Sequence, residues 1–141
     1  MITLTDYWMG RDVAYGLSLT PDIQRNAART VDLINALLAV AKVAGVTFKH
    51  SPTTGTYLSS GWRPPAVNAT TKNASKTSLH MTGEAGDVYD EADRLDAWLM
   101  TPAGQKAMAD LGLWHEHPSA TPNWAHVQTR PPKSGNRTFY P

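Results

Sequence analysis

The sequence predicts an α+β domain in which helices pack against a small antiparallel sheet. Three observations support this fold class: one long amphipathic helical pattern near the N-terminus, several short segments that read as strands, and a pair of these that forms a hairpin near the C-terminus. A chain of 141 residues can build one substantial core but not two. We therefore expect a single domain that spans residues 1–141.

The long helix is predicted between residues 21 and 44. Thr20 is a suitable N-cap, Pro21 suits the first helical position, and Gly45 fits just past the end. Between these signals, apolar residues recur every three or four positions, as on the buried side of a helix. The predicted buried stripe consists of Ile23, Ala27, Val31, Ile34, Leu38 and Ala41.

Two shorter helices are predicted later in the chain. Asp90 can cap a helix over residues 91–100, and Thr101 can cap a second one over residues 102–111. Residues 66–77 are small and polar, which indicates a helical turn followed by a loop. Ahead of all these elements, three bulky side chains are expected to pack on the core: Tyr7, Trp8 and Met9.

Extended segments are predicted between turn signals, at residues 46–48, 56–60, 87–89, 113–117 and 124–129. Pro64 and Pro65 stop regular structure after the second of these, because proline cannot donate to a strand ladder. Residues 130–141 contain three prolines and three basic residues. We expect this C-terminal segment to be an extended arm packed on the surface.

A candidate metal site lies in the stretch from residue 78 to residue 87. His80 and Asp87 are seven positions apart, so they do not share one helical face. The glycines between them suit two short extended pieces joined by a turn, which would bring the imidazole and the carboxylate together. A third ligand is offered by His126, which alternation places on one strand face with Trp124 and Gln128.

At these motifs the chain resembles a known family. The pattern Ser-x-His-x-x-Gly-x-Ala-x-Asp, followed by a late Trp-x-His, is similar to that of the zinc D-alanyl-D-alanine carboxypeptidases and L-alanyl-D-glutamate endopeptidases. These peptidoglycan peptidases include VanX-type dipeptidases and several phage endolysins. Upstream, residues 60–63 (Ser-Gly-Trp-Arg) are similar to a Ser-Gly-Tyr-Arg segment of the family. The first motif is met by Ser78, His80, Gly83, Ala85 and Asp87.

The resemblance covers about half of the chain and implies both a site and a function. One zinc per chain would be bound by His80, Asp87 and His126 in a hedgehog/D,D-peptidase-like fold. Ser78 would steady a ligand by hydrogen bonding, and Arg63 would grip a carbonyl or carboxylate of a peptidoglycan peptide. The family includes D,D-carboxypeptidases, D,D-endopeptidases and L-alanyl-D-glutamate endopeptidases, which share these motifs. The motifs therefore do not determine which of these peptide bonds is cut.

The motifs do not determine which residue acts as the general base. Several members of the family have a glutamate three residues before the last histidine, where this chain has Asn123, which cannot accept a proton. Glu116 is the nearest carboxylate upstream and is the base that we favour. Strand alternation sets a constraint: if Glu116 faces the metal, His115 and His117 face away. The two histidines are the alternative, since imidazole can also act as a base.

Two other functions fit parts of the pattern. Two histidines and a carboxylate also bind iron in the non-heme oxygenases, but those usually carry the first histidine and the carboxylate two residues apart on one strand. A zinc-stabilised module that binds peptidoglycan without cutting it is the main alternative, and the absence of a carboxylate at Asn123 is its support. Release of new amino termini from purified cell wall would distinguish an enzyme from a binder.

Composition limits the remaining possibilities. The formal net charge is +1, so there is no global electrostatic case for nucleic-acid binding, and the chain has no cysteine for a disulfide or a thiolate metal site. No apolar run is long enough to span a membrane. The N-terminal residues lack the pattern of a secretory signal. We expect a monomer that is made in the cytoplasm. To act on the cell wall it would need a phage lysis system, a virion or a leader that has been removed.

Overall fold

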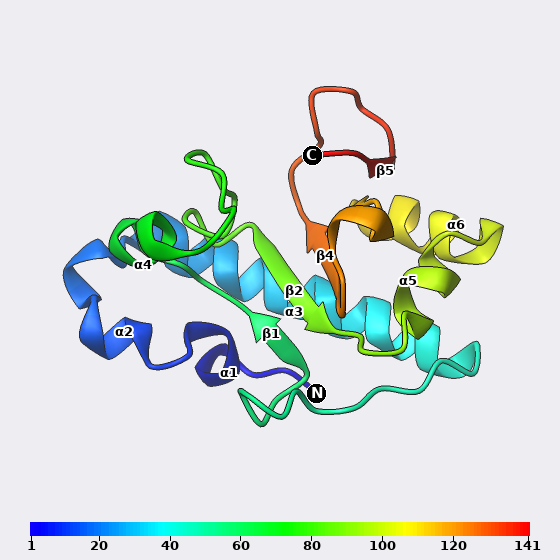
Figure 1. Cartoon of the computed structure of the whole chain (residues 1–141), viewed down its shortest axis with the longest axis horizontal. Coiled ribbons are helices and arrows are strands. Elements are labelled where there is room, and N and C mark those ends of the chain that lie inside the picture. Colours follow the sequence, from blue (N-terminus) through cyan, green and yellow to red (C-terminus); the bar gives the residue numbers. More distant parts are fainter.

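The computed structural model describes residues 1–141 and has an α+β architecture. A five-stranded sheet lies at the centre of the molecule, and α3 runs behind it in the view of Figure 1. The strands are β1 (Leu58–Ser60), β2 (Ala85–Tyr89), β3 (Trp114–Glu116), β4 (Trp124–Gln128) and β5 (Thr138–Phe139). The helices are α1 (Leu4–Trp8), α2 (Arg11–Ala14), α3 (Pro21–Val43), α4 (Pro65–Thr70), α5 (Arg94–Leu99) and α6 (Pro102–Leu111), with short 3-10 turns at Gly16–Ser18 and Pro118–Ala120.

The sheet is mixed rather than wholly antiparallel. Its order is β1-β2-β4-β3-β5; the first four strands pair antiparallel, whereas β5 is parallel to β3. The C-terminal arm, expected only to pack on the surface, supplies this fifth strand. It does so because the edge strand β3 has free backbone donors: His115 N donates to Arg137 O at 2.9 Å and His117 N to Phe139 O at 2.7 Å.

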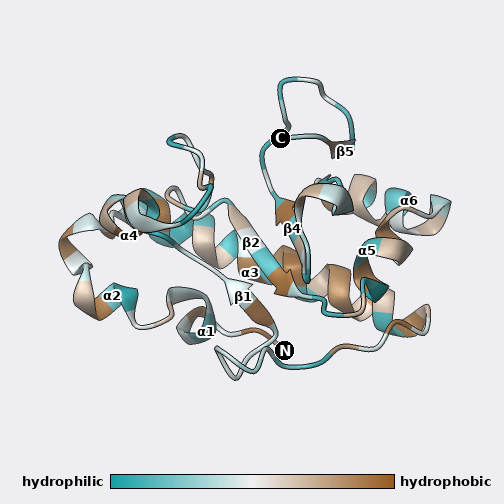
Figure 2. Ribbon diagram, viewed as in Figure 1, coloured by the Kyte–Doolittle hydropathy of each residue, from teal (hydrophilic) through white to brown (hydrophobic).

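The long helix matches its prediction. Thr20 caps α3 through a hydrogen bond from Ile23 N to its Oγ1 at 3.3 Å, and Gly45 follows the helix with φ +90°. Residues of the predicted stripe are buried, apart from Ile23, which is partly buried. Figure 2 shows hydrophobic residues along the part of α3 that lies behind the sheet. The core therefore lies between α3 and one face of the sheet.

Three predicted elements differ from the structure. Pro65, which was expected to stop regular structure, is the first residue of α4, because proline is tolerated in the first turn of a helix. Residues 46–48 form no strand, because no neighbouring strand pairs with them; Val46 and Phe48 instead pack against the edge of the core. The helix expected from residue 91 begins at Arg94. Asp90 still acts as a cap, since its carboxylate accepts from the backbone N–H groups of Arg94 and Asp96 at 3.0 and 2.9 Å. The helix at residues 102–111 and its caps are as predicted.

The N-terminal aromatic residues pack on the core, as expected. Tyr7 and Trp8 are buried in α1, and the Tyr7 hydroxyl donates to Ala85 O at 2.6 Å. Trp8 also packs edge to face against the buried Trp62, with ring centroids 5.7 Å apart. None of the helices combines the length and the apolar character needed to cross a bilayer.

Gly61 lies against the backbone of α1 and cannot carry a side chain without displacing it. A Cβ at this position would lie 2.1 Å from Tyr7 O, far closer than two unbonded atoms can approach. The contact is held by Trp62 N, which donates to the same carbonyl at 3.0 Å. A glycine is therefore needed where β1 leaves the sheet.

Gly61→Ala should lower the free energy of unfolding by about 1–3 kcal/mol, because the added methyl group must push the chain away from α1. Urea denaturation measures the loss. The matched control is Gly16→Ala, since a Cβ at Gly16 meets no atom within 4 Å. Equal stability of the two variants would show that α1 yields easily and that the close approach is not required.

Candidate metal centre

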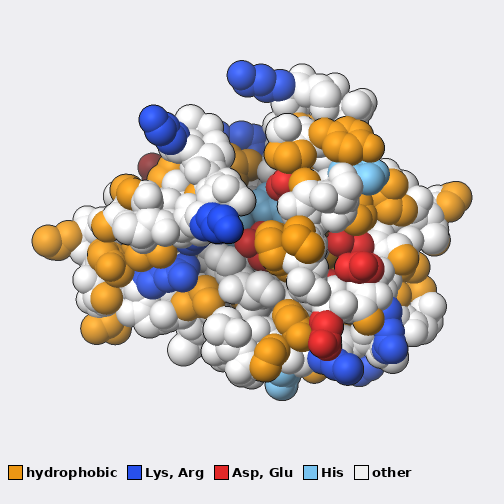
Figure 3. All heavy atoms as spheres, viewed as in Figure 1, with side chains coloured by type: hydrophobic (Ala, Val, Ile, Leu, Met, Phe, Trp, Pro, Cys, Tyr) orange, Lys and Arg blue, Asp and Glu red, His pale blue; other side chains and the backbone are white.

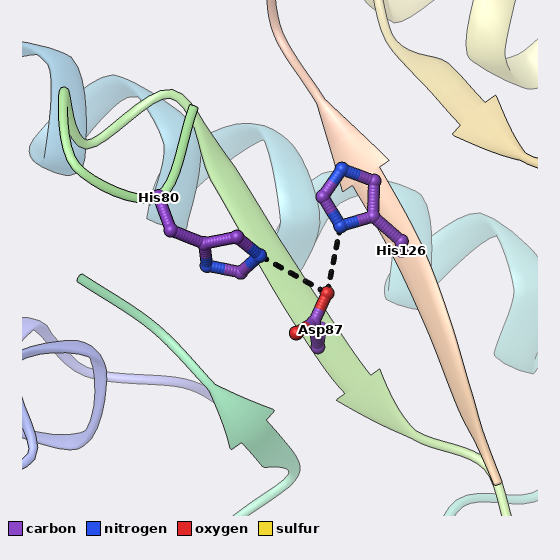
Figure 4. Close-up of side chains that lie close together, drawn as sticks. All are labelled: His80, Asp87 and His126. Atoms are coloured by element: carbon purple, nitrogen blue, oxygen red, sulfur yellow. Dashed lines mark hydrogen bonds and ion pairs between the residues drawn. The ribbon is translucent and has the colours of Figure 1, made fainter. Parts of the chain in front are cut away.

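His80 is held in one orientation by the backbone of Gly61. The imidazole is buried, and its Nδ1 lies 2.7 Å from Gly61 O. A carbonyl oxygen can only accept, so Nδ1 carries the proton in this hydrogen bond and the lone pair of the neutral ring is on Nε2. That lone pair points at Asp87 (Figure 4). The backbone thus sets both the direction and the tautomer of this histidine.

The loop that carries His80 is fixed to α3. Asn26 Nδ2 donates to Thr82 O at 3.0 Å, and Thr30 Oγ1 donates to Gly83 O at 2.8 Å. Gly83 has φ +76°, and a Cβ there would lie 2.8 Å from the backbone of α3. The glycine in the motif therefore permits the turn and also lets the loop approach the helix.

Asp87 and His126 are directly opposite each other on β2 and β4. The preceding residue, Gly86, faces α3, since a Cβ there would lie 2.8 Å from Ile34 Cδ1. Because strand side chains alternate, Asp87 faces the opposite side of the sheet. Figure 4 shows all three side chains on that side, with α3 behind the strands.

In His126, as in His80, the ring nitrogen that faces away from Asp87 forms a hydrogen bond to an oxygen atom. Its Nδ1 lies 2.7 Å from Asp87 Oδ1, and its Nε2 lies 3.3 Å from Gln128 Oε1. The Gln128 amide is oriented by its Nε2, which donates to Arg130 O at 2.7 Å. The amide oxygen therefore faces His126, so Nε2–H donates to it and Nδ1 of the neutral ring keeps its lone pair towards Asp87.

Two lone pairs and a carboxylate oxygen thus converge. His80 Nε2 and His126 Nδ1 lie 3.2 and 2.7 Å from Asp87 Oδ1, and the three donor atoms all lie within 4.8 Å of one another. If both rings are neutral, each lone pair faces Asp87 Oδ1, which is also an acceptor. A proton or a cation must therefore lie between the rings and the carboxylate. Two ligands of a tetrahedral zinc are about 3.3 Å apart, given ligand distances of about 2.0–2.1 Å. The buried group could hold one metal ion.

The charges of the three residues are coupled. Burial opposes ionisation of Asp87, but the two histidines outweigh it and hold the pKa of this carboxyl well below its usual range. Burial lowers the pKa of His80, which favours the neutral ring. For His126 burial acts in the same direction, but the hydrogen bond to Asp87 and the negative charges of Asp87 and Glu116 together outweigh it and raise the pKa. Protons and a metal ion therefore compete for the lone pair of His126.

Arg63 and Ser78 lie next to this group. Arg63 N donates to His80 O at 3.1 Å, and its Nη2 donates to Ser78 Oγ at 3.0 Å. Ser78 Oγ also accepts from His80 N at 3.4 Å. The hydroxyl of Ser78 thus contacts the backbone of the ligand residue and the arginine, whereas the imidazole itself is oriented by Gly61.

The strand beside β4 brings in Glu116. Because His115 is opposite Val127, the next residue of β3 is aligned with His126. Glu116 therefore faces the same side as the candidate metal ligands, and burial raises the pKa of its carboxyl, with His126 partly opposing this. His115 faces away, as alternation requires: it is buried, and its Nε2 lies 2.8 Å from Asp96 Oδ1.

The other candidate residues lie outside the group. His117 is just beyond β3, where its Nδ1 accepts from Ser119 N at 3.2 Å and its ring stacks on Tyr140. Asn123 has φ +72° and its carbonyl accepts from Asp90 N at 2.9 Å. Asparagine tolerates this left-handed conformation better than most residues, which explains its presence at the turn into β4.

Two groups that orient the histidines had no assigned role in the sequence-based prediction. Gln128 shares a strand face with His126, and alternation was the signal that could have indicated it. Gly61 acts through its carbonyl oxygen, which no side-chain pattern reveals. Both supply the outer hydrogen bond that metal-binding histidines usually make.

Comparison of the chain with protein-family models, with curated proteins and with solved structures finds no match. The class of site is therefore defined by its geometry alone. It is a buried group of two histidines and one aspartate that could hold a metal ion, carried by two neighbouring strands and the loop ahead of them.

Alanine at His80, Asp87 or His126 should each reduce bound metal sharply, because every variant removes one of three converging donors. Metal analysis of the purified variants after dialysis measures this. His117→Ala is the matched control, since its ring is stacked on Tyr140 away from the group. Unchanged metal content in all three ligand variants would show that the group does not bind metal.

Gln128→Met should weaken metal binding about 10–100-fold, the usual effect of removing an outer hydrogen-bond partner of a metal-binding histidine. The substitution keeps the side-chain length but removes the oxygen that accepts from His126. Competition with a chromophoric chelator gives the dissociation constant. An unchanged dissociation constant would mean that β4 orients the His126 ring without help from Gln128.

Proposed function

We propose that the protein is a zinc-dependent peptidase that hydrolyses a peptide bond in bacterial peptidoglycan peptides. The observation that carries the proposal is the commitment of the outer nitrogens of both histidines to carbonyl oxygens, which directs both lone pairs at Asp87. The ordered motifs of residues 60–63, 78–87 and 124–126 resemble those of the zinc D,D-peptidase family. Geometry thus supports the metal, and resemblance supports the substrate.

Zinc is the metal that suits this donor set. Two imidazoles and one carboxylate are the ligands of several catalytic zinc sites, which keep a further position for water or substrate. Bound there, zinc would polarise the scissile carbonyl and lower the pKa of a water molecule. Residues of the chain would transfer the proton and orient the substrate.

Glu116 is the residue that we assign to proton transfer. It lies on the same side of the sheet as His126, and the two side chains are close enough to affect each other's pKa. Its carboxylate would accept a proton from the attacking water and pass it to the leaving amine nitrogen. Burial raises its pKa, which makes the protonated form easier to reach during turnover.

Arg63 is the residue that we assign to substrate orientation. Its backbone N–H donates to His80 O, so Arg63 lies directly beside this candidate metal ligand. The Nη2 atom is used by Ser78, while the Nε atom is buried without a hydrogen-bond partner. The accessible part of the guanidinium, oriented by the bond to Ser78, is suited to a carbonyl or carboxylate oxygen of the substrate.

A peptidoglycan-binding module that does not cut its ligand is the second candidate, because Asn123 stands where several family members have their base. Incubation of the zinc-loaded protein with purified cell wall separates the two functions. Release of new amino termini supports a peptidase, whereas sedimentation with the wall without release supports the binder. Mass spectrometry of fragments from defined muropeptides then identifies the bond.

Glu116→Gln should reduce kcat by a factor of about 10²–10⁴ with normal zinc content, because the amide keeps the size of the side chain and cannot accept the proton. Hydrolysis of a defined muropeptide, followed by chromatography, measures the rate. His117→Ala is the matched control on the same segment and should stay near the wild-type rate. An active glutamine variant together with an inactive His117→Ala would transfer the role to imidazole.

A further inference from the structure

The C-terminal strand places Phe139 beside Glu116, the proposed base. Glu116 of β3 is paired with Phe139 of β5. Glu116 is also aligned with His126 of β4, which is opposite Asp87 of β2. The four residues therefore form one row across four neighbouring strands, which are about 4.7–4.9 Å apart. Residues paired in this way point to the same side of a sheet, so the Phe139 ring lies on the side of the candidate metal centre.

The contacts of the preceding residue support this direction. Thr138 Oγ1 accepts from Gln105 Nε2 of α6 at 2.8 Å and lies 3.5 Å from Nδ1 of the buried His115. His115 faces away from the candidate metal ligands, so Thr138 does as well. Because side chains alternate along a strand, Phe139 faces towards the ligands. Its position is fixed by His117 N, which donates to Phe139 O at 2.7 Å.

The hydrophobic core does not use the Phe139 ring. The side chain is partly exposed and is not among those that pack against the core, whereas the next residue, Tyr140, stacks on His117 with ring centroids 4.4 Å apart. Figure 3 shows hydrophobic atoms next to the acidic and histidine atoms at the centre of the face that carries the site. An aromatic ring offers a large apolar surface whose burial is favourable. The ring is therefore available to contact a bound molecule beside Glu116.

We propose that Phe139 contacts the side chain of the substrate residue that follows the scissile bond, so that the enzyme selects a residue with apolar side-chain carbon atoms at this position. This inference rests on the proposed function and gives the C-terminal strand a role in specificity. The order of the row carries it. The strand ligands lie on β2 and β4, Glu116 lies on β3, and Phe139 lies one strand further from the metal.

The direction of proton transfer places this substrate residue. Glu116 would deliver a proton to the leaving amine nitrogen, which belongs to the residue after the cut, so this nitrogen must come within about 2.6–3.2 Å of the carboxylate. Figure 4 shows His80 and His126 on either side of Asp87, and Glu116 lies on the strand beyond His126. The side chain attached next to the leaving nitrogen would therefore lie over β3 and β5, where the Phe139 ring is.

The test compares two substrates of the zinc-loaded wild type that differ only in the residue after the cut. One carries the natural residue and the other carries glycine, which keeps the backbone and removes the carbon atoms that Phe139 would contact. The glycine form should have a kcat/KM at least about tenfold lower, because one small apolar group in an apolar site is worth about 10–200-fold. Equal kcat/KM values for the two forms would overturn the proposal.

Phe139→Ala then assigns the selectivity to the residue. The ratio of the two kcat/KM values should fall towards one, mainly because the natural substrate is cut more slowly, while zinc content stays normal. Phe139→Leu keeps apolar surface and should retain most of the ratio. Tyr140→Ala is the matched control on the same segment, since its ring stacks on His117. A merely structural role for Phe139 would slow both substrates equally and leave the ratio unchanged, which would overturn the assignment.

The side of the scissile bond is tested separately. Replacing the residue before the cut by glycine should change kcat/KM by the same factor in the wild type and in Phe139→Ala. If Phe139→Ala instead alters the discrimination at this earlier residue and leaves the discrimination after the cut intact, the ring lies on the other side of the bond and the proposal is wrong.

Failure of the proposed function is distinguished by binding. Titration calorimetry with N-acetyl-D-alanyl-D-alanine and N-acetyl-D-alanyl-glycine tests the contact without hydrolysis. If no muropeptide bond is cut, but the wild type binds the first peptide about tenfold more tightly and Phe139→Ala loses this preference, the peptidase proposal fails and the apolar contact stands. If hydrolysis occurs without a preference that depends on Phe139, the contact fails and the peptidase proposal stands. The absence of both hydrolysis and preferential binding would overturn both.

Discussion

The carboxylate of Asp87 is the group on which the site depends. It is buried in a sheet, it is ionised, and two imidazole lone pairs point at one of its oxygens. A buried charge of this kind is tolerated only when opposite charge or hydrogen bonds compensate for it. A cation at the meeting point would satisfy all three groups at once. The group could therefore hold a metal ion at this point, in competition with a proton on His126.

The rest of the fold holds the donors of this group in place. The α3 helix fixes the His80 loop through Asn26 and Thr30, and α1 contacts the Gly61 backbone that orients the His80 ring. The Tyr7 hydroxyl binds Ala85 O at the start of β2, so α1 also contacts the strand that carries Asp87. The hydrophobic core on one face of the sheet thus determines the geometry of the polar site on the other.

The two faces of β3 show the same division of roles. Its outward residue, Glu116, lies beside the candidate metal centre, while its inward residue, His115, is buried against Asp96 of α5. This buried pair fastens β3 to the helical layer and leaves His115 unable to reach the proposed reaction. The fifth strand then covers the outer edge of β3. The strand of three residues that carries Glu116 is thus fixed on both sides, by β4 and by β5.

Local signals in the sequence were sufficient for much of this description. The caps of α3 and α6, the alternation along β4 and the motif from Ser78 to Asp87 all depend on neighbours within a few residues, so they can be read from the chain alone. The candidate ligands follow from them, whereas alternation left the facing of Glu116 open and the register of β3 with β4 decided it. Zinc and the peptidoglycan substrate remain proposals that rest on the resemblance.

Other features were decided only by the tertiary structure, because they join segments far apart in the chain. The acceptor of His80 Nδ1 is a backbone carbonyl 19 residues away, and every residue type has such a carbonyl. The parallel pairing of β5 depends on the free edge of β3, and the Arg11 guanidinium donates to Trp62 O, 51 residues away. A residue pattern specifies which side chains are present, but packing decides which backbone groups and charges meet them.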